Sequence, residues 1–398
     1  MAYLRNRAVN LLNVHYGLHA LAMYGAGVFF AVFLLKEGIS APVVFAAIAL
    51  ILAGRFVVRP LVLVLAPRVG VRALVAFGTV FLGVTYPILA EVKGVDWWLL
   101  AFCVTGAIGD AFYWTSYHAY FATVGDSEHR GHQIGAREAL ASVVGVVAPL
   151  IGGWTLTVFG PRAAFGAAAF VHVLAALPFF GTPDVRVAPH VKDSFRTALP
   201  SVLLFAADGW IAAGYLFVWQ IALFITLKES YSVFGGVVAL AALAGAIGGL
   251  LLGKHIDAGH GRRAVWLGVG SIALVTILRA FSTDIPAMAV IANALGGFVG
   301  DLYIPTLMTA VYNQAKESPC TLRFHFATEG GWDTGGALGC LTAALLSWVG
   351  APFAAGILMS LFGAALSAVL LWRYYPSGRA ARTGELDAAV TSAGASLH

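Results

Sequence analysis

Residues 11–35 read LLNVHYGLHALAMYGAGVFFAVFLL, and this run contains no Asp, Glu, Lys or Arg. A helix needs about 20 consecutive apolar residues to cross the hydrocarbon core of a bilayer. The run is too long for the core of a secretory signal, and no clear cleavage site follows it. It therefore predicts a first transmembrane helix close to the N-terminus.

The composition of the whole chain agrees with this prediction. Of the 398 residues, 60% are hydrophobic and only 11% are charged, whereas a soluble domain carries about 25% charged residues. A chain of this length with so few charges lacks the polar side chains needed to cover a surface that faces water. Most of its surface is therefore expected to face lipid.

Apolar runs like the first one recur along the chain, separated by short polar breaks. They predict an all-α membrane protein of about twelve transmembrane helices, in two pseudo-symmetric six-helix bundles over residues 1–182 and 201–374. A polar linker at 183–200 is expected between the bundles, and a disordered tail at 375–398. The predicted spans are 11–35, 41–66, 72–92, 97–124, 134–159, 162–182, 201–227, 233–256, 264–282, 286–315, 325–349 and 351–374.

Positively charged residues predict the orientation of these spans. Cytoplasmic loops of membrane proteins carry an excess of Lys and Arg. With the N-terminus inside, most Lys and Arg residues fall on the cytoplasmic side, and the exceptions are Lys36, Lys93, Arg162, Lys228 and Arg279. We expect a multi-pass protein of a cell membrane, with a bacterial inner membrane as its compartment and both termini in the cytoplasm. We also expect it to be a monomer.

The two halves of the sequence repeat each other at a fixed offset of 191 residues, which is 297 minus 106 for the first matched glycines. Apolar matches are common by chance in such a chain, but matched intramembrane acids are not. The repeat predicts a duplicated transporter whose substrate site lies between the halves and which works by alternating access. The matched pairs are Gly106–Gly297, Gly109–Gly300, Asp110–Asp301 and Glu138–Glu329.

Two loops resemble the cytoplasmic loop signature of the major facilitator superfamily, G-x-x-x-D-R-x-G-R-R. The loop between spans 8 and 9 reads GKHIDAGHGRR over residues 253–263, with one inserted residue and no Arg after the Asp. The loop between spans 2 and 3 reads PRVGVR over residues 67–72, with Pro where the Asp belongs. The resemblance implies the fold of this superfamily and a cytoplasmic latch formed by Arg68, Gly70, Arg72, Gly253, Asp257, Gly261, Arg262 and Arg263.

Span 5 contains GVVAPLIGG over residues 145–153, which resembles the core of the antiporter signature of the same superfamily, G-P-x-x-G-G. Ala148 stands in place of the first Gly of that core. Proline bends a membrane helix, and small residues let neighbouring helices approach closely. The resemblance favours an exporter, although Gly and Pro are frequent in membrane helices in any case.

Span 4 carries the most informative polar residues. Asp110, Trp114, Tyr117 and His118 recur at helical spacing on one face. Ionisable groups inside a bilayer are costly and usually face a cavity or a partner. This face is either a proton or cation site with aromatic walls, or a polar packing face between helices.

We place proton coupling on Asp110 first. Arg137 and Glu138 begin span 5 at about the depth of His118, so Glu138 either contacts His118 or joins the cytoplasmic latch. The further proton-coupling candidates are Glu138, Glu329, His118 and Asp301.

Other polar and aromatic residues are candidates for the wall of the substrate cavity. Arg55 and Arg59 share one face of span 2, where they bind an anionic group, reach the membrane surface or pair with acids. His15 and His19 are also four residues apart, a spacing that suits a metal ion, although two histidines more often serve a hydrogen bond between helices. The candidates are His15, Tyr16, His19, Arg55, Arg59, Trp114, Tyr117, Arg137, Asp208, Trp219, Gln220, Trp332 and Asp333.

These residues leave three transport functions open: proton-coupled export of a small organic molecule, proton-coupled import of a nutrient or ion, and transport of a divalent metal. Because the proton-coupling and cavity candidates together include six acids but three arginines, the partners expected are protons and a cationic or neutral small molecule, within the lipid bilayer. The sequence contains no nucleotide loop, catalytic triad or metalloprotease motif, and its three cysteines are far apart. We therefore expect no enzymatic activity, no cofactor, no resident metal and no nucleic-acid partner.

Overall fold

A computed structural model describes residues 6–124, 130–186, 195–256 and 261–375, and these residues are almost entirely helical. Within these ranges it describes the backbone alone at 122, 130–136, 138, 250–256, 261 and 301. The described residues contain no β-strand. Apart from Tyr375, the predicted tail lies outside the described residues, as does the middle of the predicted linker.

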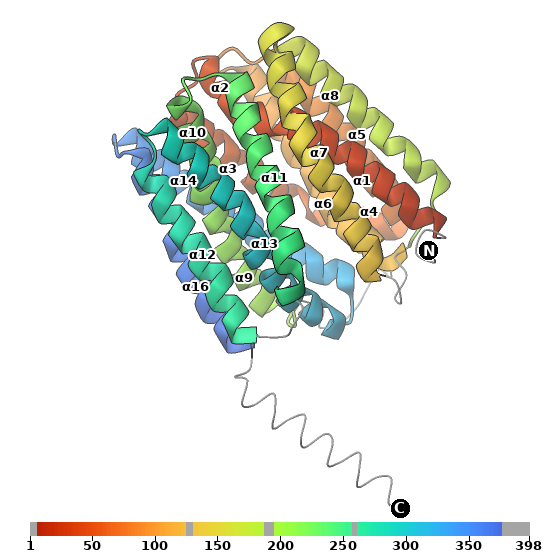
Figure 1. The fold of residues 1–398 in the computed structure, drawn as a ribbon. Coiled ribbons are helices and arrows are strands. Elements are labelled where there is room, and N and C mark those ends of the chain that lie inside the picture. The colour runs from red at the N-terminus through yellow and green to blue at the C-terminus, as the bar shows by residue number, and fades with distance from the viewer. Residues whose placement is uncertain (1–5, 125–129, 187–194, 257–260, 376–398) are drawn as a thin grey trace, which may run out of the picture.

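The N-terminal half consists of six spans, several of them broken into two helices (Figure 1). A short 3-10 turn interrupts the first span around the glycines at 25 and 27, and Arg59 and Pro60 divide the second. The helices are α1 (Arg7–Gly25), η2 (Gly27–Phe29), α2 (Phe30–Lys36), α3 (Ala41–Val58), α4 (Pro60–Val69), α5 (Val71–Ala90), α6 (Trp97–Val124), α7 (Arg130–Val158), α8 (Gly160–Ala176) and η3 (Leu177–Gly181).

The C-terminal half repeats this plan with six further spans. Its first span contains a π-helical turn, η4, and such turns often mark functional sites in helices. The helices are α9 (Leu199–Ala212), η4 (Ala213–Val218), α10 (Trp219–Thr226), α11 (Tyr231–Ile256), α12 (Gly261–Phe281), α13 (Pro286–Glu317), α14 (Thr321–Trp348), α15 (Phe353–Leu358) and α16 (Ser360–Tyr374).

The predicted architecture of about twelve membrane helices is confirmed. In the part of the chain that the structure describes, 10 helical segments are long and apolar enough to cross a membrane. Helices α6 and α14 complete the set, with 28 residues each. Both carry acids within the helix, Asp110 in α6 and Glu329 and Asp333 in α14. Acids inside the membrane region are not confined to these two helices, since α9, which belongs to one of the ten apolar segments, carries Asp208.

Small residues let helices of the two halves touch where α7 lies beside α11 (Figure 1). A Cβ atom added to Gly153 would lie 2.5 Å from the carbonyl oxygen of Tyr231, and one added to Gly235 would lie 2.3 Å from that of Pro149. Within the N-terminal half, a Cβ atom on Gly152 would lie 1.7 Å from the carbonyl oxygen of Gly25. The glycines and proline at 149–153 therefore pack α7 tightly against both α1 and α11.

The two halves also repeat one close contact between neighbouring spans. Gly78 of α5 faces the backbone of Tyr113 on α6, and a Cβ atom there would lie 2.5 Å from the Tyr113 nitrogen. Gly268 of α12 faces Tyr303 of α13 in the same way, with 3.1 Å between the added Cβ and the Tyr303 Cα. The third and fourth spans of each half thus pack in a corresponding manner.

The loop before α5 is attached to the segment that follows the sixth span of the same half. Gly70 adopts φ +84°, and a Cβ atom there would lie 2.2 Å from the carboxylate of Asp184, so glycine is required. Arg72 donates a hydrogen bond to the carbonyl oxygen of Thr182 at 2.8 Å. Arg68 instead donates to the carbonyl of Val64, within its own helix.

The corresponding loop of the second half is described only in part. Arg262 donates to the carbonyl oxygen of Tyr375 at 3.0 Å and stacks on Trp372, so it too contacts the segment after the sixth span. Arg263 is exposed at the start of α12. Asp257 lies outside the described residues, and no side-chain contact is described at Gly253 or Gly261. The latch in this loop stays a prediction.

Candidate substrate cavity

A cavity of about 530 Å³ lies between the two halves. This volume suits a small organic molecule, since ligand pockets range over about 300–1,000 Å³. Both halves contribute to its wall, through α1, η2, α2, α3, α5 and α6 on one side and α9, η4, α13 and α14 on the other. The lining residues are Met23, Gly27, Phe30, Ile48, Ile51, Leu52, Arg55, Leu82, Thr85, Tyr86, Leu89, Phe102, Gly106, Asp110, Trp114, His118, Phe205, Asp208, Leu216, Phe217, Ile304, Leu307, Met308, Glu329 and Trp332.

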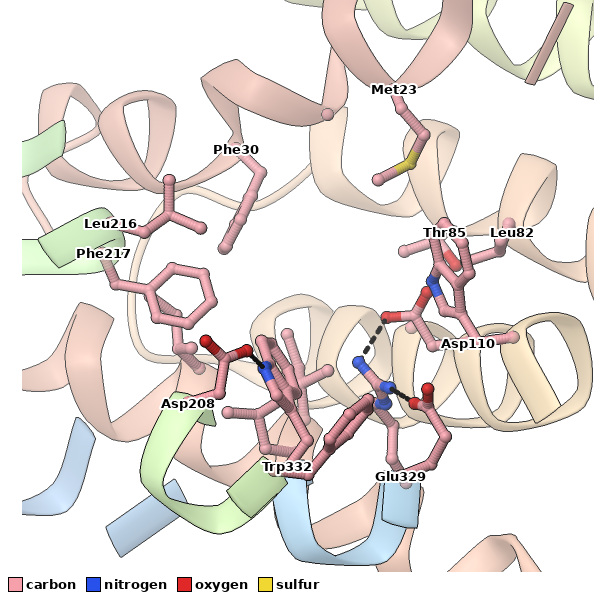
Figure 2. Close-up of a pocket in the computed structure, with 18 of the residues that line it drawn as sticks. Met23, Phe30, Leu82, Thr85, Asp110, Asp208, Leu216, Phe217, Glu329 and Trp332 are labelled. Carbon is pink, nitrogen blue, oxygen red and sulfur yellow. Dashed lines mark hydrogen bonds and ion pairs between the residues drawn. The ribbon is translucent and has the colours of Figure 1, made fainter. Parts of the chain in front are cut away.

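Most of this wall is apolar or aromatic, and its carboxyl groups lie on opposite sides. Figure 2 shows Asp110 and Glu329 at one side of the cavity, and Asp208 at the other side beside Trp332 and Phe217. Phe30 and Met23 face the same space from the first span. The cavity therefore combines an apolar body with a few charged groups, which is the usual composition of a small-molecule site.

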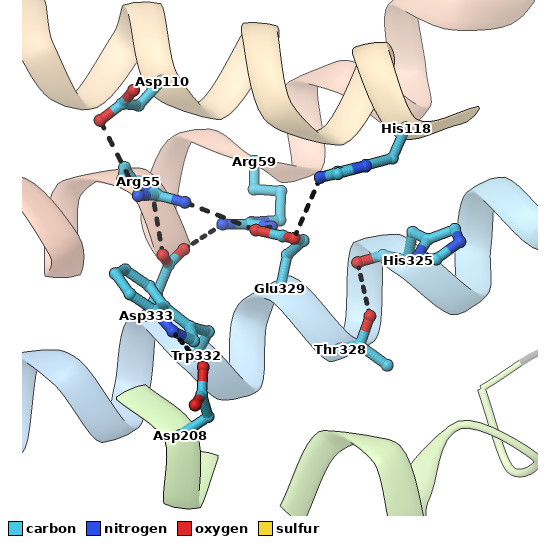
Figure 3. A network of polar contacts seen from close by, with 10 residues as sticks. All are labelled: Arg55, Arg59, Asp110, His118, Asp208, His325, Thr328, Glu329, Trp332 and Asp333. Atoms are coloured by element: carbon cyan, nitrogen blue, oxygen red, sulfur yellow. Dashed lines mark hydrogen bonds and ion pairs between the residues drawn. The ribbon is translucent and has the colours of Figure 1, made fainter. Parts of the chain in front are cut away.

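Arg55 of α3 is the centre of a cluster of ion pairs (Figure 3). Its guanidinium nitrogens lie 3.8 Å from an oxygen of Asp110, 3.5 Å from one of Glu329 and 3.1 Å from one of Asp333. Arg59, one helical turn further on, lies 3.6 Å from Glu329 and forms a close ion pair with Asp333. We call Arg55, Arg59, Asp110, Glu329 and Asp333 the charge cluster.

The charge cluster joins the two halves of the protein. Arg55 belongs to α3 and Arg59 directly follows it, both in the second span of the N-terminal half, whereas Glu329 and Asp333 belong to α14 of the C-terminal half. Arg59 continues the helical turn, because its N–H donates to the carbonyl oxygen of Arg55. Residues four apart lie on the same face of a helix, so the two arginines of the second span meet the two acids of α14. Of the interpretations open for Arg55 and Arg59, the structure supports pairing with acids.

Three acids of the charge cluster face two guanidinium groups, and Asp208 adds a fourth carboxyl to the cavity. Asp208 accepts a hydrogen bond from the indole nitrogen of Trp332 at 3.0 Å. Burying charge in a membrane protein is costly unless partners compensate it. With its histidines uncharged, the cavity therefore has an excess of negative charge that a cation or a proton would offset.

His118 borders the cavity on the side of the charge cluster. Its Nε2 lies 4.0 Å from a carboxyl oxygen of Glu329, and its ring stacks on that of His325 with 6.0 Å between centroids. The predicted contact of His118 with Glu138 is untested, because the side chain of Glu138 lies outside the described residues. The side chain of Asp301 lies outside them as well, so both remain candidates from sequence alone.

The histidines of the first span are buried within the N-terminal half and are not among the described residues that line the cavity. His15 contacts the carbonyl oxygen of Ala175 at 2.7 Å and the hydroxyl of Tyr113 at 3.1 Å. The ring of His19 stacks on that of Tyr113, with 4.1 Å between centroids. The contacts of His15 match the predicted hydrogen bond between helices, whereas both ring nitrogens of His19 are buried without a described hydrogen-bond partner.

Several other cavity candidates also lie away from the described lining. Tyr16 and Tyr117 stack on each other inside the N-terminal half, and Arg137 lies over the ring of Tyr16 at 4.9 Å. Trp219 is buried in the C-terminal half, where its indole nitrogen donates to Asn293 at 2.9 Å. Gln220 is half-buried beside it in the chain. Of the predicted set, Arg55, Trp114, Asp208 and Trp332 line the cavity, with Arg59 and Asp333 directly behind it.

Histidine, cysteine and acidic side chains do not gather into a metal-binding group in the part of the chain that the structure describes. His15 and His19 face Tyr113, whereas Asp110 faces Arg55. His15 and His19, the pair whose spacing suits a metal ion, therefore lie in the interior of the N-terminal half, whereas Asp110 and His118 line the cavity.

Sequence reasoning missed the apolar part of the cavity wall. Phe30, Phe102, Phe205 and Phe217 line it, but phenylalanine is common in this chain, with 26 residues. Apolar residues face lipid, protein and cavity alike in such a protein. Phe217 stands out only in the structure, where it lies in the π-helical turn.

Comparison with known proteins identifies the family. The family model of the Major Facilitator Superfamily matches residues 14–318, which is most of the chain. The chain belongs to this superfamily, and it is a multi-pass membrane transporter of a small solute. The resemblance inferred from the two cytoplasmic loops is thereby confirmed. No sequence among the curated proteins matches the chain significantly.

Solved structures of transporters share the fold. The POT family transporter PepTSo is similar with a TM-score of 0.67 and 13% identity, over 96% of this chain and 98% of that one. The human organic anion transporter MFSD10 (TETRAN) gives a TM-score of 0.65 and 15% identity, over 92% and 99%. An auto-inhibited POT family peptide transporter gives 0.60 and 14%, over 92% and 96%. At these identities the likeness shows the fold alone.

Proposed function

We propose that the protein is a proton-coupled secondary transporter that exports a small cationic or neutral organic molecule in exchange for protons. The observation that carries this proposal is the charge cluster at the wall of the cavity between the halves. Its acids outnumber its guanidinium groups, and it connects α3 to α14. A proton bound or released there changes the contacts that hold the two halves together.

Asp110 is the acid of the charge cluster best suited to exchange a proton. Among the described ion pairs it has one, to Arg55 at 3.8 Å, which is longer than a hydrogen bond. Glu329 contacts Arg55, Arg59 and His118, and Asp333 contacts both arginines. Protonation of Asp110 therefore sacrifices the longest of the contacts with arginine, while Glu329 and Asp333 keep their guanidinium partners.

Alternating access supplies the transport step. When Asp110 is neutral, Arg55 is held by Glu329 and Asp333 of α14 alone, so the balance of charge between the halves depends on the proton. Rocking of one half against the other then exposes the cavity to the opposite side of the membrane. The close packing at 149–153 and its likeness to the antiporter signature favour export over import.

The test is Asp110→Asn in purified protein reconstituted into liposomes. A substrate identified by thermal-shift screening is given under an imposed pH gradient, and uptake is compared with passive exchange of the same substrate. The variant should lose accumulation driven by the gradient but retain exchange. Asp284→Asn, the same change at an exposed loop residue, is the matched control. Unchanged gradient-driven accumulation in Asp110→Asn would exclude Asp110 as the coupling group.

The same liposomes distinguish export from import. In an exporter that exchanges substrate for protons, substrate and protons cross the membrane in opposite directions. In a symporter they cross in the same direction. The proposed orientation, with both termini in the cytoplasm of a bacterial cell, is tested separately by reporter fusions. A fusion at residue 190 of the linker should report a cytoplasmic location, and an external location would reject this topology.

A further inference from the structure

Asp208 differs from the other carboxyl groups of the cavity in its partners. Asp110, Glu329 and Asp333 each form an ion pair with an arginine, whereas the described contacts of Asp208 are all with uncharged groups. These contacts are the indole nitrogen of Trp332 at 3.0 Å and the hydroxyl of Tyr303. Asp208 therefore presents a half-buried carboxyl to the cavity without a described cationic partner.

A seam of glycines fixes the position of this carboxyl. A Cβ atom on Gly209, the next residue, would lie 2.2 Å from the carbonyl oxygen of Trp332, and one on Gly335 would lie 1.9 Å from that of Ala206. The backbones of α9 and α14 therefore touch beside Asp208. This contact holds the carboxyl and the indole of Trp332 in register, so the site is formed before any ligand enters.

The surroundings of Asp208 suit an organic cation. Figure 2 shows the carboxyl beside Trp332 and below Phe217, and both aromatic side chains line the cavity. An ammonium group is attracted both by a carboxylate and by the faces of aromatic rings. The remaining wall, with residues such as Phe30, Leu52 and Met308, accommodates an apolar body.

We propose that Asp208 binds the ammonium group of the substrate, and that the substrate is an amine or quaternary ammonium compound with an apolar or aromatic body. This inference rests on the proposed transport function and assigns its substrate class. Asp208 and Asp110 then have separate tasks: Asp208 holds the cationic group of the substrate, and Asp110 exchanges the proton.

Trp332 connects the two tasks. Its indole nitrogen donates to Asp208, and the guanidinium carbon of Arg55 lies over its ring at 5.4 Å. A cation that binds to Asp208 therefore changes the surroundings of an indole that also contacts the charge cluster (Figure 3). Trp332 acts as a positioning residue between the substrate site of the C-terminal half and the arginine of the N-terminal half.

The experiment uses equilibrium binding to the purified full-length protein, without a gradient. The probes are three compounds of similar shape: benzyltrimethylammonium, its neutral carbon isostere neopentylbenzene, and the anion phenylmethanesulfonate. The wild type should bind the cation about ten- to hundred-fold more tightly than the other two, as expected when a desolvated quaternary ammonium group meets a carboxylate and aromatic faces. Asp208→Asn should bind the three probes about equally tightly. Asp208→Glu and the control Asp284→Asn should keep most of the preference for the cation.

Three results would overturn the proposal: equal or tighter binding of the neutral or anionic probe by the wild type, no binding of the cation, or an unchanged preference in a folded Asp208→Asn variant. The binding assay is independent of proton coupling. If the wild type prefers the cation but Asp110→Asn still accumulates substrate, the coupling proposal fails and the assignment of Asp208 stands. If gradient-driven transport depends on Asp110 but Asp208→Asn binds as the wild type does, the reverse holds.

Discussion

Removal of Arg59 tests whether the charge cluster holds the two halves together. The Arg59 side chain is 1% exposed, and its partner Asp333 is fully buried. Arg59→Met keeps an unbranched apolar stem but removes the guanidinium group, which leaves Asp333 and Glu329 with Arg55 as their remaining guanidinium partner. The variant therefore places uncompensated negative charge inside the membrane region.

The expected cost follows from the burial of both partners. Breaking a buried ion pair by removing one partner costs about 3–5 kcal/mol, whereas replacing both partners with apolar residues is close to neutral. Because Arg55 still lies 3.1 Å from Asp333, we expect a cost for Arg59→Met near the lower end, about 3 kcal/mol. The free energy of unfolding of the double variant Arg59→Met/Asp333→Leu should be only about 1 kcal/mol below that of the wild type, since Arg55 stays paired with Glu329.

A double-mutant cycle measures this difference. The free energy of unfolding is determined in mixed micelles for the wild type, both single variants and the double variant. The losses in the free energy of unfolding caused by the two single changes should together exceed the loss in the double variant by about 2 kcal/mol or more, because both changes act on the same ion pair. The control cycle uses Lys93 and Glu37, which pair at 2.9 Å in a loop where Lys93 is 59% exposed, and its coupling should stay below about 1 kcal/mol. A coupling for Arg59 and Asp333 no larger than that of the control pair would refute the reasoning.

Two further predictions concern packing and pH. Gly152→Ala should destabilise the protein by about 1–3 kcal/mol, because its Cβ would lie 1.7 Å from the Gly25 carbonyl oxygen; Gly166→Ala, with no atom within 4 Å of its added Cβ, is the control and should leave the unfolding temperature unchanged or slightly raised. The guanidinium of Arg162, which donates to both Glu91 oxygens, holds the pKa of the Glu91 carboxyl below its ordinary value of 4.5. The pair thus adds stability above that pH, and the contribution disappears as the pH falls through the lowered pKa. Glu91→Gln should flatten this part of the acid dependence of thermal unfolding, and parallel curves for variant and wild type would contradict the assignment.

The sequence was sufficient to predict the membrane helices and the main acids of the cavity, because both follow from the cost of polar groups in lipid. A span must be long and apolar, and an acid such as Asp110 or Glu329 inside a span needs a cavity or a partner. The partners themselves were not predictable. Arg55 and Asp333 are 278 residues apart (333 minus 55) and meet because α3 packs against α14 across the two halves.

The sequence also could not predict which face of a helix lines the cavity and which face packs against neighbouring helices. His15 and His19 share a face of α1, and their spacing says nothing about whether this face meets the cavity or the neighbouring helices. In the structure α1 packs against α7 and α8, and the two histidines point toward Tyr113 and the backbone of Ala175. The phenylalanines of the cavity wall were hidden for a related reason, since an apolar residue has no distinguishing partner in a membrane protein.

The separate roles proposed for Asp208 and Asp110 determine whether net charge crosses the membrane during transport. If Asp208 holds a monovalent ammonium group in one half of the cycle and one carboxyl of the cavity holds a proton in the other half, both loaded forms carry the same net charge. Exchange of one cation for one proton is then electroneutral, and the membrane potential, which acts with about 2.3 kcal/mol per charge and 100 mV, does no work on it.

In liposomes, a pH gradient alone should therefore drive accumulation of benzyltrimethylammonium, and a potential set by potassium and valinomycin alone should not. Accumulation that follows the potential at equal pH on both sides would show that net charge crosses the membrane. In that case a second carboxyl among Asp110, Glu329 and Asp333 exchanges a proton in each cycle, because the charge cluster is the other group of described acids beside the cavity.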